Sequence, residues 1–206
     1  MSKTRTLASR FALALAATLL AASTASAQVQ TFEADKVHSN ITFKIRHLLS
    51  KTTGLFKDYT ATVEIDPAKR EEVKVSAEIQ VASIDTDDAK RDAHLRNEDF
   101  FDAAKFPVMT FTGGNLTAVN AERTKGKLEG TLTIKGVAKP VVLDVEWLGT
   151  AVDPWGNHKA AFSGNTTINR KDFGIIWNKT LDSGGYLIGE EVDIEINIEA
   201  QIPKPG

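Results

Sequence analysis

One short segment, Arg91 to Pro107, holds most of the side chains that could do chemistry in this sequence. It combines arginine, histidine and carboxylate groups with three phenylalanines, whereas the chain around it mostly alternates between apolar and polar residues. Arg91 and His94 are three residues apart, so a helix would place them on one face. The forked donors of arginine suit an oxygen acceptor, and histidine can donate to one as well. With His47, which ends an apolar strand face, they are predicted to contact the polar head group of a ligand.

The charges of the same segment also have a structural interpretation. Asp92 and Arg96 are four residues apart on the expected helix, a spacing that allows an ion pair. With Arg91, Glu98 and Asp99 they could form a salt-bridge network that fixes the segment to the rest of the fold. The two roles can coexist, and the sequence leaves both open.

Three phenylalanines, Phe100, Phe101 and Phe106, are predicted to form the apolar underside of the segment and to close one end of the fold. Contact with an apolar ligand is the alternative. Further along, Trp177 and Tyr186 flank a Gly184-Gly185 pair, which suggests either a mobile lid or an ordinary surface loop.

Other kinds of site find little support in the residue pattern. The four histidines have no short-range metal-ligand spacing, and a chain without cysteine has no disulfide or thiolate site. No Gly-x-Ser-x-Gly motif occurs, and Ser39 next to His38 on a strand would point to the opposite face. We therefore predict no metal, no catalytic residues and no cofactor beyond a bound ligand.

The first 27 residues resemble a secretory leader. Lys3, Arg5 and Arg10 precede an apolar run that is shorter than the roughly 20 residues of a membrane-spanning helix, and Ala25-Ser26-Ala27 follows it. Cleavage there predicts a single domain of residues 28–206, located in the periplasm and without stable membrane insertion. The remaining 22 Lys and Arg against 27 Asp and Glu give a net charge of −5, which disfavours a nucleic-acid partner.

Period-2 alternation predicts an all-β fold. The clearest strand is the last, where Val192 to Ile202 places apolar residues at every second position. A break is expected at Ser50 to Phe56, a strand end at Gly113-Gly114 and a long loop with a turn of helix at Phe173 to Gly189. A helix is expected at Asp88 to Arg96, with Thr86 or Asp87 as its N-cap and Asn97 in the left-handed conformation at its end. A second short helical turn is expected at Asp99 to Ala104. The other expected strands are Val37–His47, Tyr59–Ile65, Val73–Val81, Val108–Thr112, Leu116–Val119, Leu128–Ile134, Val141–Gly149 and Ala160–Ile168.

About eight long antiparallel strands with one apolar face favour a barrel over a sandwich. The predicted inner faces carry small residues beside branched aliphatic ones, and such a lining can leave a cavity for one small ligand. A filled barrel, in which the small residues mark strand bends, stays open as an alternative. The small residues are Ala61, Ala77, Gly130, Gly149, Ala160, Gly164 and Ala200.

Several separated motifs resemble the YceI family of bacterial periplasmic proteins. They are Asp35-x-x-His38-Ser39-x-Ile41-x-Phe43, Arg91-Asp92-x-His94-Leu95-Arg96 with Asp99-Phe100-Phe101, Gly130-Thr131-Leu132-Thr133-Ile134-x-Gly136-Val137, Arg170-x-Asp172-Phe173-Gly174, and Gly189-Glu190-Glu191-Val192. The usual Gly-Asp-Glu before the final strand is Gly-Glu-Glu here.

This resemblance implies an extended, lipocalin-like, eight-stranded antiparallel barrel with the short helical insert capping one end. It also implies a carrier for a long polyisoprenoid lipid, such as an isoprenoid quinone or a polyprenyl phosphate. An enzyme acting on such a lipid and a stress-related interaction module are the alternatives, and a homodimer through an edge or a loop is left open. The residues expected to line the tunnel or its cap are Phe43, Ile45, Phe100, Phe101, Phe162 and Trp177.

Overall fold

A computed structural model describes residues 29–66, 69, 71–182 and 184–202. The predicted leader lies outside these residues. One α-helix is found in the described part, α1 (Ala89–Arg96), with two short 3-10 helices, η1 (Val81–Ser83) and η2 (Arg170–Phe173). The strands are β1 (Gln30–Ala34), β2 (Asn40–His47), β3 (Ser50–Phe56), β4 (Tyr59–Ile65), β5 (Lys74–Gln80), β6 (Ile84–Asp85), β7 (Val108–Thr117), β8 (Lys125–Ile134), β9 (Val137–Val152), β10 (His158–Asn169) and β11 (Ile188–Gln201).

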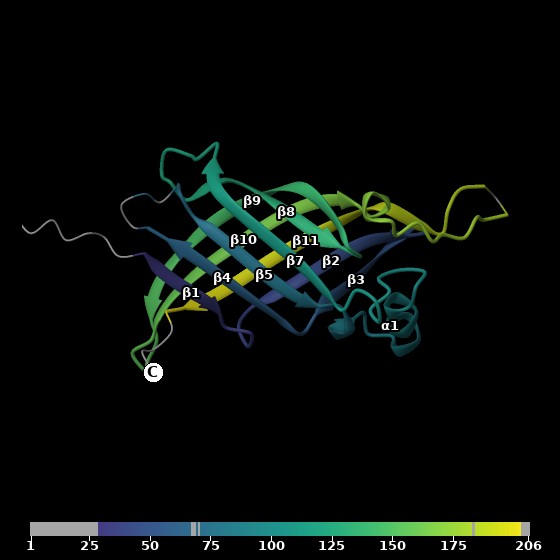
Figure 1. The fold of residues 1–206 in the computed structure, drawn as a ribbon, viewed down its shortest axis with the longest axis horizontal. Coiled ribbons are helices and arrows are strands. Elements are labelled where there is room, and N and C mark those ends of the chain that lie inside the picture. The colour runs from purple at the N-terminus through teal and green to yellow at the C-terminus, as the bar shows by residue number, and fades with distance from the viewer. Residues whose placement is uncertain (1–28, 67–68, 70, 183, 203–206) are drawn as a thin grey trace, which may run out of the picture.

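Eight of these strands close into an antiparallel barrel (Figure 1). They follow the order β1-β4-β5-β7-β8-β9-β10-β11, and β1 pairs with β11 through Ala34 and Ala200. The β2–β3 hairpin lies along the rest of β11, where Phe43 is opposite Ile194, and β6 extends the sheet beyond β3. The predicted all-β barrel with a short helical insert is confirmed.

Strand length explains the closure. β9 has 16 residues and β11 has 14, which at about 3.3 Å per residue makes them roughly 45–55 Å long. A twisted sheet of such strands with one apolar face must cover that face, and curling onto itself removes the exposed edges as well.

The capping insert differs in detail from the prediction. Asp88, rather than Thr86 or Asp87, is the N-cap, because its carboxylate accepts hydrogen bonds from the backbone N–H groups of Lys90 and Arg91 at 3.0 and 2.9 Å. Asn97 at the helix end is extended, with φ −80°, rather than left-handed.

The second helical turn predicted at Asp99 to Ala104 is wrong. This stretch consists of turns that bond back to the helix, with Phe101 N donating to Leu95 O and Ala103 N donating to Arg96 O. The C-terminal carbonyls of α1 are thereby satisfied by the chain that follows them.

The break predicted at Ser50 to Phe56 is also wrong, because this segment is strand β3. Gly54 lies inside the strand and not at a turn. A Cβ at Gly54 would lie 2.4 Å from Cζ of Phe43 on the neighbouring strand, so the glycine leaves room for that ring. Glycine is needed here because the Phe43 side chain packs directly against the backbone. From the sequence alone, such a glycine looks the same as one in a turn.

Two other boundaries changed. Gly113 and Gly114 do not end a strand but lie within β7, next to a register shift against β8. Strand β1 was not predicted, because its inward-facing residues, Phe32 and Ala34, are too few to show a period. The long loop at Phe173 to Gly189 is confirmed, with its turn of helix placed earlier, at η2.

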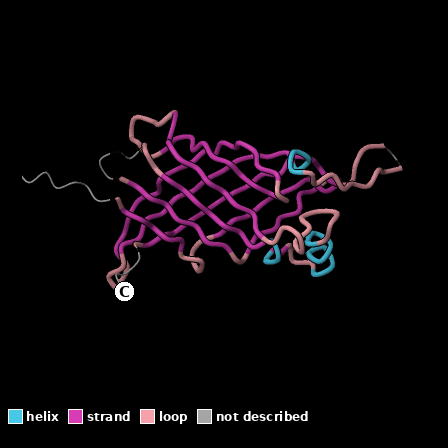
Figure 2. The backbone as a smooth tube through the Cα atoms, in the orientation of Figure 1, coloured by secondary structure: helices cyan, strands magenta, loops and turns pink. Residues whose placement is uncertain are grey.

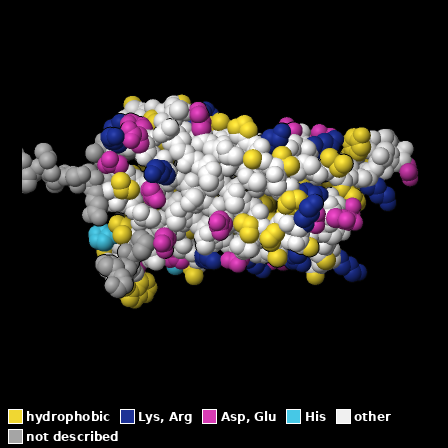
Figure 3. Space-filling model, viewed as in Figure 1, with side chains coloured by type: hydrophobic (Ala, Val, Ile, Leu, Met, Phe, Trp, Pro, Cys, Tyr) yellow, Lys and Arg dark blue, Asp and Glu magenta, His cyan; other side chains and the backbone are white. Residues whose placement is uncertain are grey.

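The outer surface carries interspersed acidic and basic side chains with scattered hydrophobic ones, as the face in Figure 3 shows. Cross-strand ion pairs lie on this surface, such as Lys44 with Glu195 at 3.2 Å and Lys127 with Asp144 at 2.6 Å. Their side chains are about half exposed, so each pair contributes little stability, roughly 0–1 kcal/mol. No helix in the described residues is long and apolar enough to cross a membrane.

Candidate functional site

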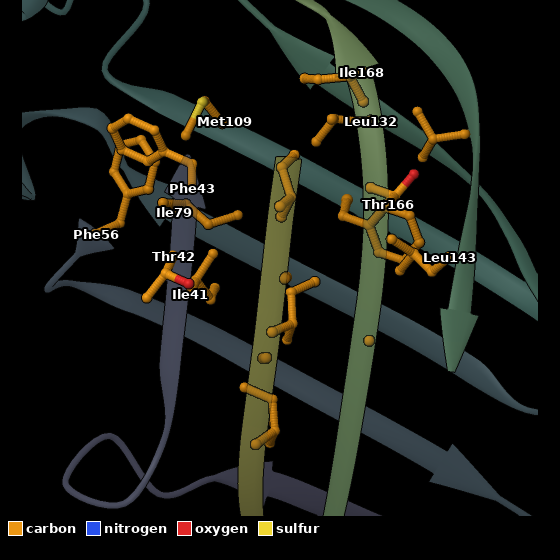
Figure 4. Close-up of a pocket in the computed structure, with 18 of the residues that line it drawn as sticks. Ile41, Thr42, Phe43, Phe56, Ile79, Met109, Leu132, Leu143, Thr166 and Ile168 are labelled. Carbon is orange, nitrogen blue, oxygen red and sulfur yellow. The ribbon is translucent and has the colours of Figure 1, made fainter. Parts of the chain in front are cut away.

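The barrel encloses a cavity of about 750 Å³. This volume lies within the roughly 300–1,000 Å³ typical of small-molecule sites. Its wall is mainly aliphatic and aromatic, and Figure 4 shows side chains pointing into it from several strands, among them Phe43 of β2, Met109 of β7 and Leu132 of β8. Apolar walls of this kind suit an apolar ligand.

Small inward residues open part of this space. Gly164 lines the cavity, and a Cβ there would meet Val145 at 3.7 Å, an ordinary contact distance. Gly130 differs, because an added Cβ would lie 2.5 Å from the Phe111 ring, which already fills that place. Ala61, Ala77 and Ala200 also line the cavity. The alternative of a filled barrel is therefore disfavoured.

An aromatic cluster closes one end of the cavity. The rings of His94 and Phe100 lie 5.0 Å apart, those of His94 and Trp177 also 5.0 Å, and those of Phe100 and Trp177 5.2 Å. The cluster joins the capping insert to the loop between η2 and β11. Figure 2 shows both segments at the same end of the barrel. We call this the capped end.

Arg91 and Asp92 hold the insert in place through Thr86. The amide N–H and the hydroxyl of Thr86 donate to Asp92 Oδ1 at 2.9 and 2.5 Å. Arg91 donates from Nε to the Thr86 hydroxyl and from Nη2 to its carbonyl, at 2.8 and 2.6 Å. Arg91 and Asp92 therefore have the predicted structural role, and Thr86 is the residue to which they bind.

The predicted Asp92–Arg96 ion pair is wrong. Both residues are described, and Arg96 instead donates to the backbone carbonyls of Ala82 and Ile84 at 3.0 and 3.2 Å. Buried Asp92 accepts from Thr86, so the two side chains use different partners on the segment of residues 82–86.

The histidines at the capped end have different surroundings. His94 Nε2 lies 3.0 Å from Asp99 Oδ2, so this imidazole already has a polar partner. The ring of His47 has no hydrogen-bond partner among the described residues. It stands at the end of β2, where Ile188 of β11 is its cross-strand neighbour.

Every residue predicted to bind the head group or to line the tunnel or its cap lies on the cavity wall, although contact with a ligand stays a prediction. Phe106, for which ligand contact was the alternative, does not line the cavity. The structure brings Arg91, His94, Phe100 and Trp177 together at the capped end, whereas Phe162 packs at 4.9 Å against Trp147 toward the other end. The predicted residues on the wall are His47, Arg91, His94, Phe43, Ile45, Phe100, Phe101, Phe162 and Trp177.

Sequence reasoning missed Arg170, a wall residue that is only 4% exposed. The signal was present, because Arg170 continues the inward period of Thr166 and Ile168, just as His47 continues that of Phe43 and Ile45. Burial holds the pKa of its guanidinium below the ordinary value, with the Glu190 carboxylate acting weakly in the opposite direction.

Three residues outside the cavity have atoms that could coordinate a metal ion, but a lysine side chain already contacts two of them. Asp35, His38 and Glu199 have donor atoms within 4.8 Å of one another, a spacing that could hold a metal ion. The Lys159 ammonium, however, contacts Asp35 at 2.6 Å and Glu199 at 3.2 Å. The lysine charge thus offsets one of the two carboxylates, and the contacts join the β1–β2 junction to β10 and β11.

Similarity to known proteins covers nearly all of the described chain. A family model described as YceI-like domain matches residues 32–200. A protein named UPF0312 protein from Pseudomonas fluorescens is 38% identical over 192 residues, which is 91% of this chain and 94% of that protein. The protein of the same name from Pseudomonas syringae pv. tomato is 40% identical over 190 residues, with the same coverage.

Solved structures agree. The Campylobacter jejuni YceI protein superposes with a TM-score of 0.66 and 39% identity, covering 78% of this chain and 91% of that one. Burkholderia cenocepacia BcnA gives a TM-score of 0.70 and 27% identity over 81% and 98% of the chains. A Saccharophagus degradans domain described as polyisoprenoid binding gives 0.58 and 14% over 85% and 100%, a likeness that shows a common fold.

Proposed function

The chain belongs to the YceI family, and on that premise we propose that it is a binding protein that holds a long polyisoprenoid lipid in its barrel cavity. The observation that carries this proposal is the elongated apolar cavity of about 750 Å³. An isoprenoid tail offers branched hydrocarbon along its whole length, and its burial contributes about 25 cal/mol per Å² of apolar surface.

The wall favours a chain over a compact molecule. Inward residues from one end of β11 to the other line the cavity, from Val192 through Ile196 to Ala200. A flexible chain can follow such a tunnel and contact the small and branched residues along its whole length. The Saccharophagus degradans domain, described as polyisoprenoid binding, supports the proposal by analogy of fold alone.

The finer proposal is an isoprenoid quinone or a polyprenyl phosphate whose head group lies at the capped end. Arg91, His94 and His47 line the cavity at this end, although charged residues such as Arg123, Lys125 and Glu146 also line it elsewhere. The proposal includes export by the leader of residues 1–27 and action in the periplasm as a carrier. It does not require chemistry on the lipid.

Extraction of the natively purified protein with organic solvent, followed by mass spectrometry, tests the proposal. We expect a prenyl lipid to co-purify, or an added isoprenoid quinone to bind in a tryptophan-fluorescence titration. A saturated fatty acid of similar carbon number is the matched control and should bind less tightly. Absence of any bound or added prenyl lipid would show the proposal to be wrong.

The same samples test the enzyme alternative. A carrier should return the bound lipid chemically unchanged after long incubation. Appearance of a new lipid product, lost in a folded His94→Ala variant, would favour an enzyme instead.

A further inference from the structure

Arg170 is the buried cation of the cavity wall. It begins η2, directly after the last residue of β10, and Asn169 caps this turn by accepting a hydrogen bond from Lys171 N at 3.0 Å. The 3-10 turn ends at Gly174, which has a φ of +75°. The guanidinium is thereby held beneath the loop that closes the capped end.

Part of the guanidinium has a structural task. Nε donates to Gly189 O at 2.8 Å, and Nη1 donates to Ile175 O and Trp177 O at 2.7 and 2.8 Å. These bonds tie β11 and the closing loop to the end of β10. Trp177, whose carbonyl is one of the acceptors, belongs to the aromatic cluster with His94 and Phe100.

The remaining nitrogen, Nη2, is buried and has no hydrogen-bond partner among the described residues. Arginine donates from all of its nitrogens and cannot accept, so only an acceptor can satisfy this one. Buried polar groups in folded proteins are nearly always paired, which makes an unpaired donor on a cavity wall a sign of an absent partner. The Glu190 carboxylate, which interacts with Arg170 through its charge, accepts a hydrogen bond from Lys171 and not from Arg170.

The residues first expected to bind the head group are less buried than Arg170: Arg91 is exposed, and His94 and His47 are half-buried, so water can satisfy their remaining polar atoms. Arg91 donates to Thr86, and His94 faces Asp99. Arg96 donates to two carbonyls, much as Arg170 does, but it does not line the cavity. Arg170 therefore combines a position on the wall, deep burial and an unused donor.

We propose that Nη2 of Arg170 donates a hydrogen bond to an oxygen of the ligand head group at the capped end, and so selects isoprenoids that carry a hydrogen-bond acceptor over plain isoprenoid hydrocarbons. The shared chemistry is an oxygen acceptor, which a quinone carbonyl or a phosphate can supply. This inference rests on the proposed function and names the ligand class for it.

Affinities for three ligands with the same prenyl chain test it: a hydrocarbon, a quinone and a monophosphate. Because a hydrogen bond to a charged group is worth tenfold or more in affinity, the wild-type protein should prefer at least one oxygen-bearing ligand over the hydrocarbon by about that factor. In Arg170→Gln the ratio of the two affinities should fall close to one. The quinone and phosphate arms identify which acceptor is used.

Arg96→Gln is the matched control. Arg96 also donates to backbone carbonyls, but it does not line the cavity. This variant should leave the ratio at the wild-type value. A ratio that stays high in Arg170→Gln, or falls equally in Arg96→Gln, overturns the inference.

A second measurement avoids dependence on the folding of the variant. In wild-type protein with ¹⁵N-labelled arginine, the Nη signals of Arg170 should shift when an oxygen-bearing ligand binds and stay in place with the hydrocarbon. Equal responses to all three ligands overturn the inference and leave the proposed function standing. If none of the three binds, it is the proposed function that fails.

Discussion

At the scale of single residues, charged groups in this protein serve mainly to join elements. Asp92 is 6% exposed and takes both its hydrogen bonds from Thr86, and Lys159 sits between Asp35 and Glu199. Charge pattern on a helix predicted an i,i+4 pair within the insert. Instead, Asp92 and Arg96 bind backbone and side-chain groups of residues 82–86, which the fold brings next to the helix.

Asp92→Ala should lower the free energy of unfolding by about 2–3 kcal/mol, since it leaves both the N–H and the hydroxyl of buried Thr86 without their acceptor. Urea unfolding followed by tryptophan fluorescence measures this. Glu98→Ala on the same insert is the control and should change stability by less than about 0.5 kcal/mol, as expected for an exposed side chain. Equal losses for the two variants would contradict the role given to Asp92.

Asp35 should make stability sensitive to acid. Hydrogen bonds from Lys159 and then His38 hold the pKa of its carboxyl below the ordinary value. A carboxylate with a lowered folded-state pKa adds stability that is complete at neutral pH and is lost as pH falls below about 4, the ordinary pKa of the unfolded chain. Thermal unfolding from pH 7 down to pH 3 should therefore show a smaller acid-dependent drop in Tm for Asp35→Asn than for wild type; an equal drop would assign the sensitivity to other groups.

At the scale of elements, close packing between neighbouring strands decides which residues are allowed. The β2–β3 hairpin needs glycine at position 54 because the Phe43 ring and a Thr86 methyl occupy the space of a Cβ. Phe43 in turn lies on the cavity wall, so the hairpin fixes part of the cavity shape. Strand β3 and the insert are thus coupled through Thr86, which touches both.

Gly54→Ala should lower the free energy of unfolding by about 1–3 kcal/mol, as overpacking of a filled site usually does. Gly164→Ala is the matched control, because its new methyl group would meet neighbours at 3.7–3.9 Å and so fits without displacement. Chemical denaturation of both variants measures the difference. Similar stabilities for the two would show that the Phe43 ring moves aside at little cost.

At the scale of the whole molecule, closure through β1 and β11 turns inward strand faces into the wall of one tunnel. The capped end is closed by α1, its following turns and the loop after η2, all of which meet at the aromatic cluster. The cavity is therefore formed by the whole closed barrel, and no single motif forms it alone.

Gly164→Phe should block the tunnel and weaken binding of a long prenyl lipid by tenfold or more, since the ring would take space that the tail needs. The backbone there is ordinary strand, opposite Val145 and Ile196, so the barrel should still form. Lipid titration with a circular dichroism control checks this. Unchanged affinity in a folded variant would place the ligand outside this part of the cavity.

The sequence by itself determined the all-β class, favoured a barrel, and identified most residues of its inner face. Alternation at period 2 identified the long strands and the inward positions of Phe43, Ile45 and Phe162, because side chains on a strand must alternate between core and solvent. A change of period identified the capping helix. These are local consequences of backbone geometry, and they survive without knowledge of the neighbours.

Only the tertiary structure decided what glycine and charge mean at each place. Gly54 and Gly113 looked like breaks but lie within strands, since the ring that requires Gly54 belongs to another strand. The partners of Asp92 and Arg96, and the unpaired nitrogen of Arg170, depend on which carbonyls and hydroxyls the closed barrel brings near them. Such contacts join residues far apart in the chain, and no local pattern encodes them.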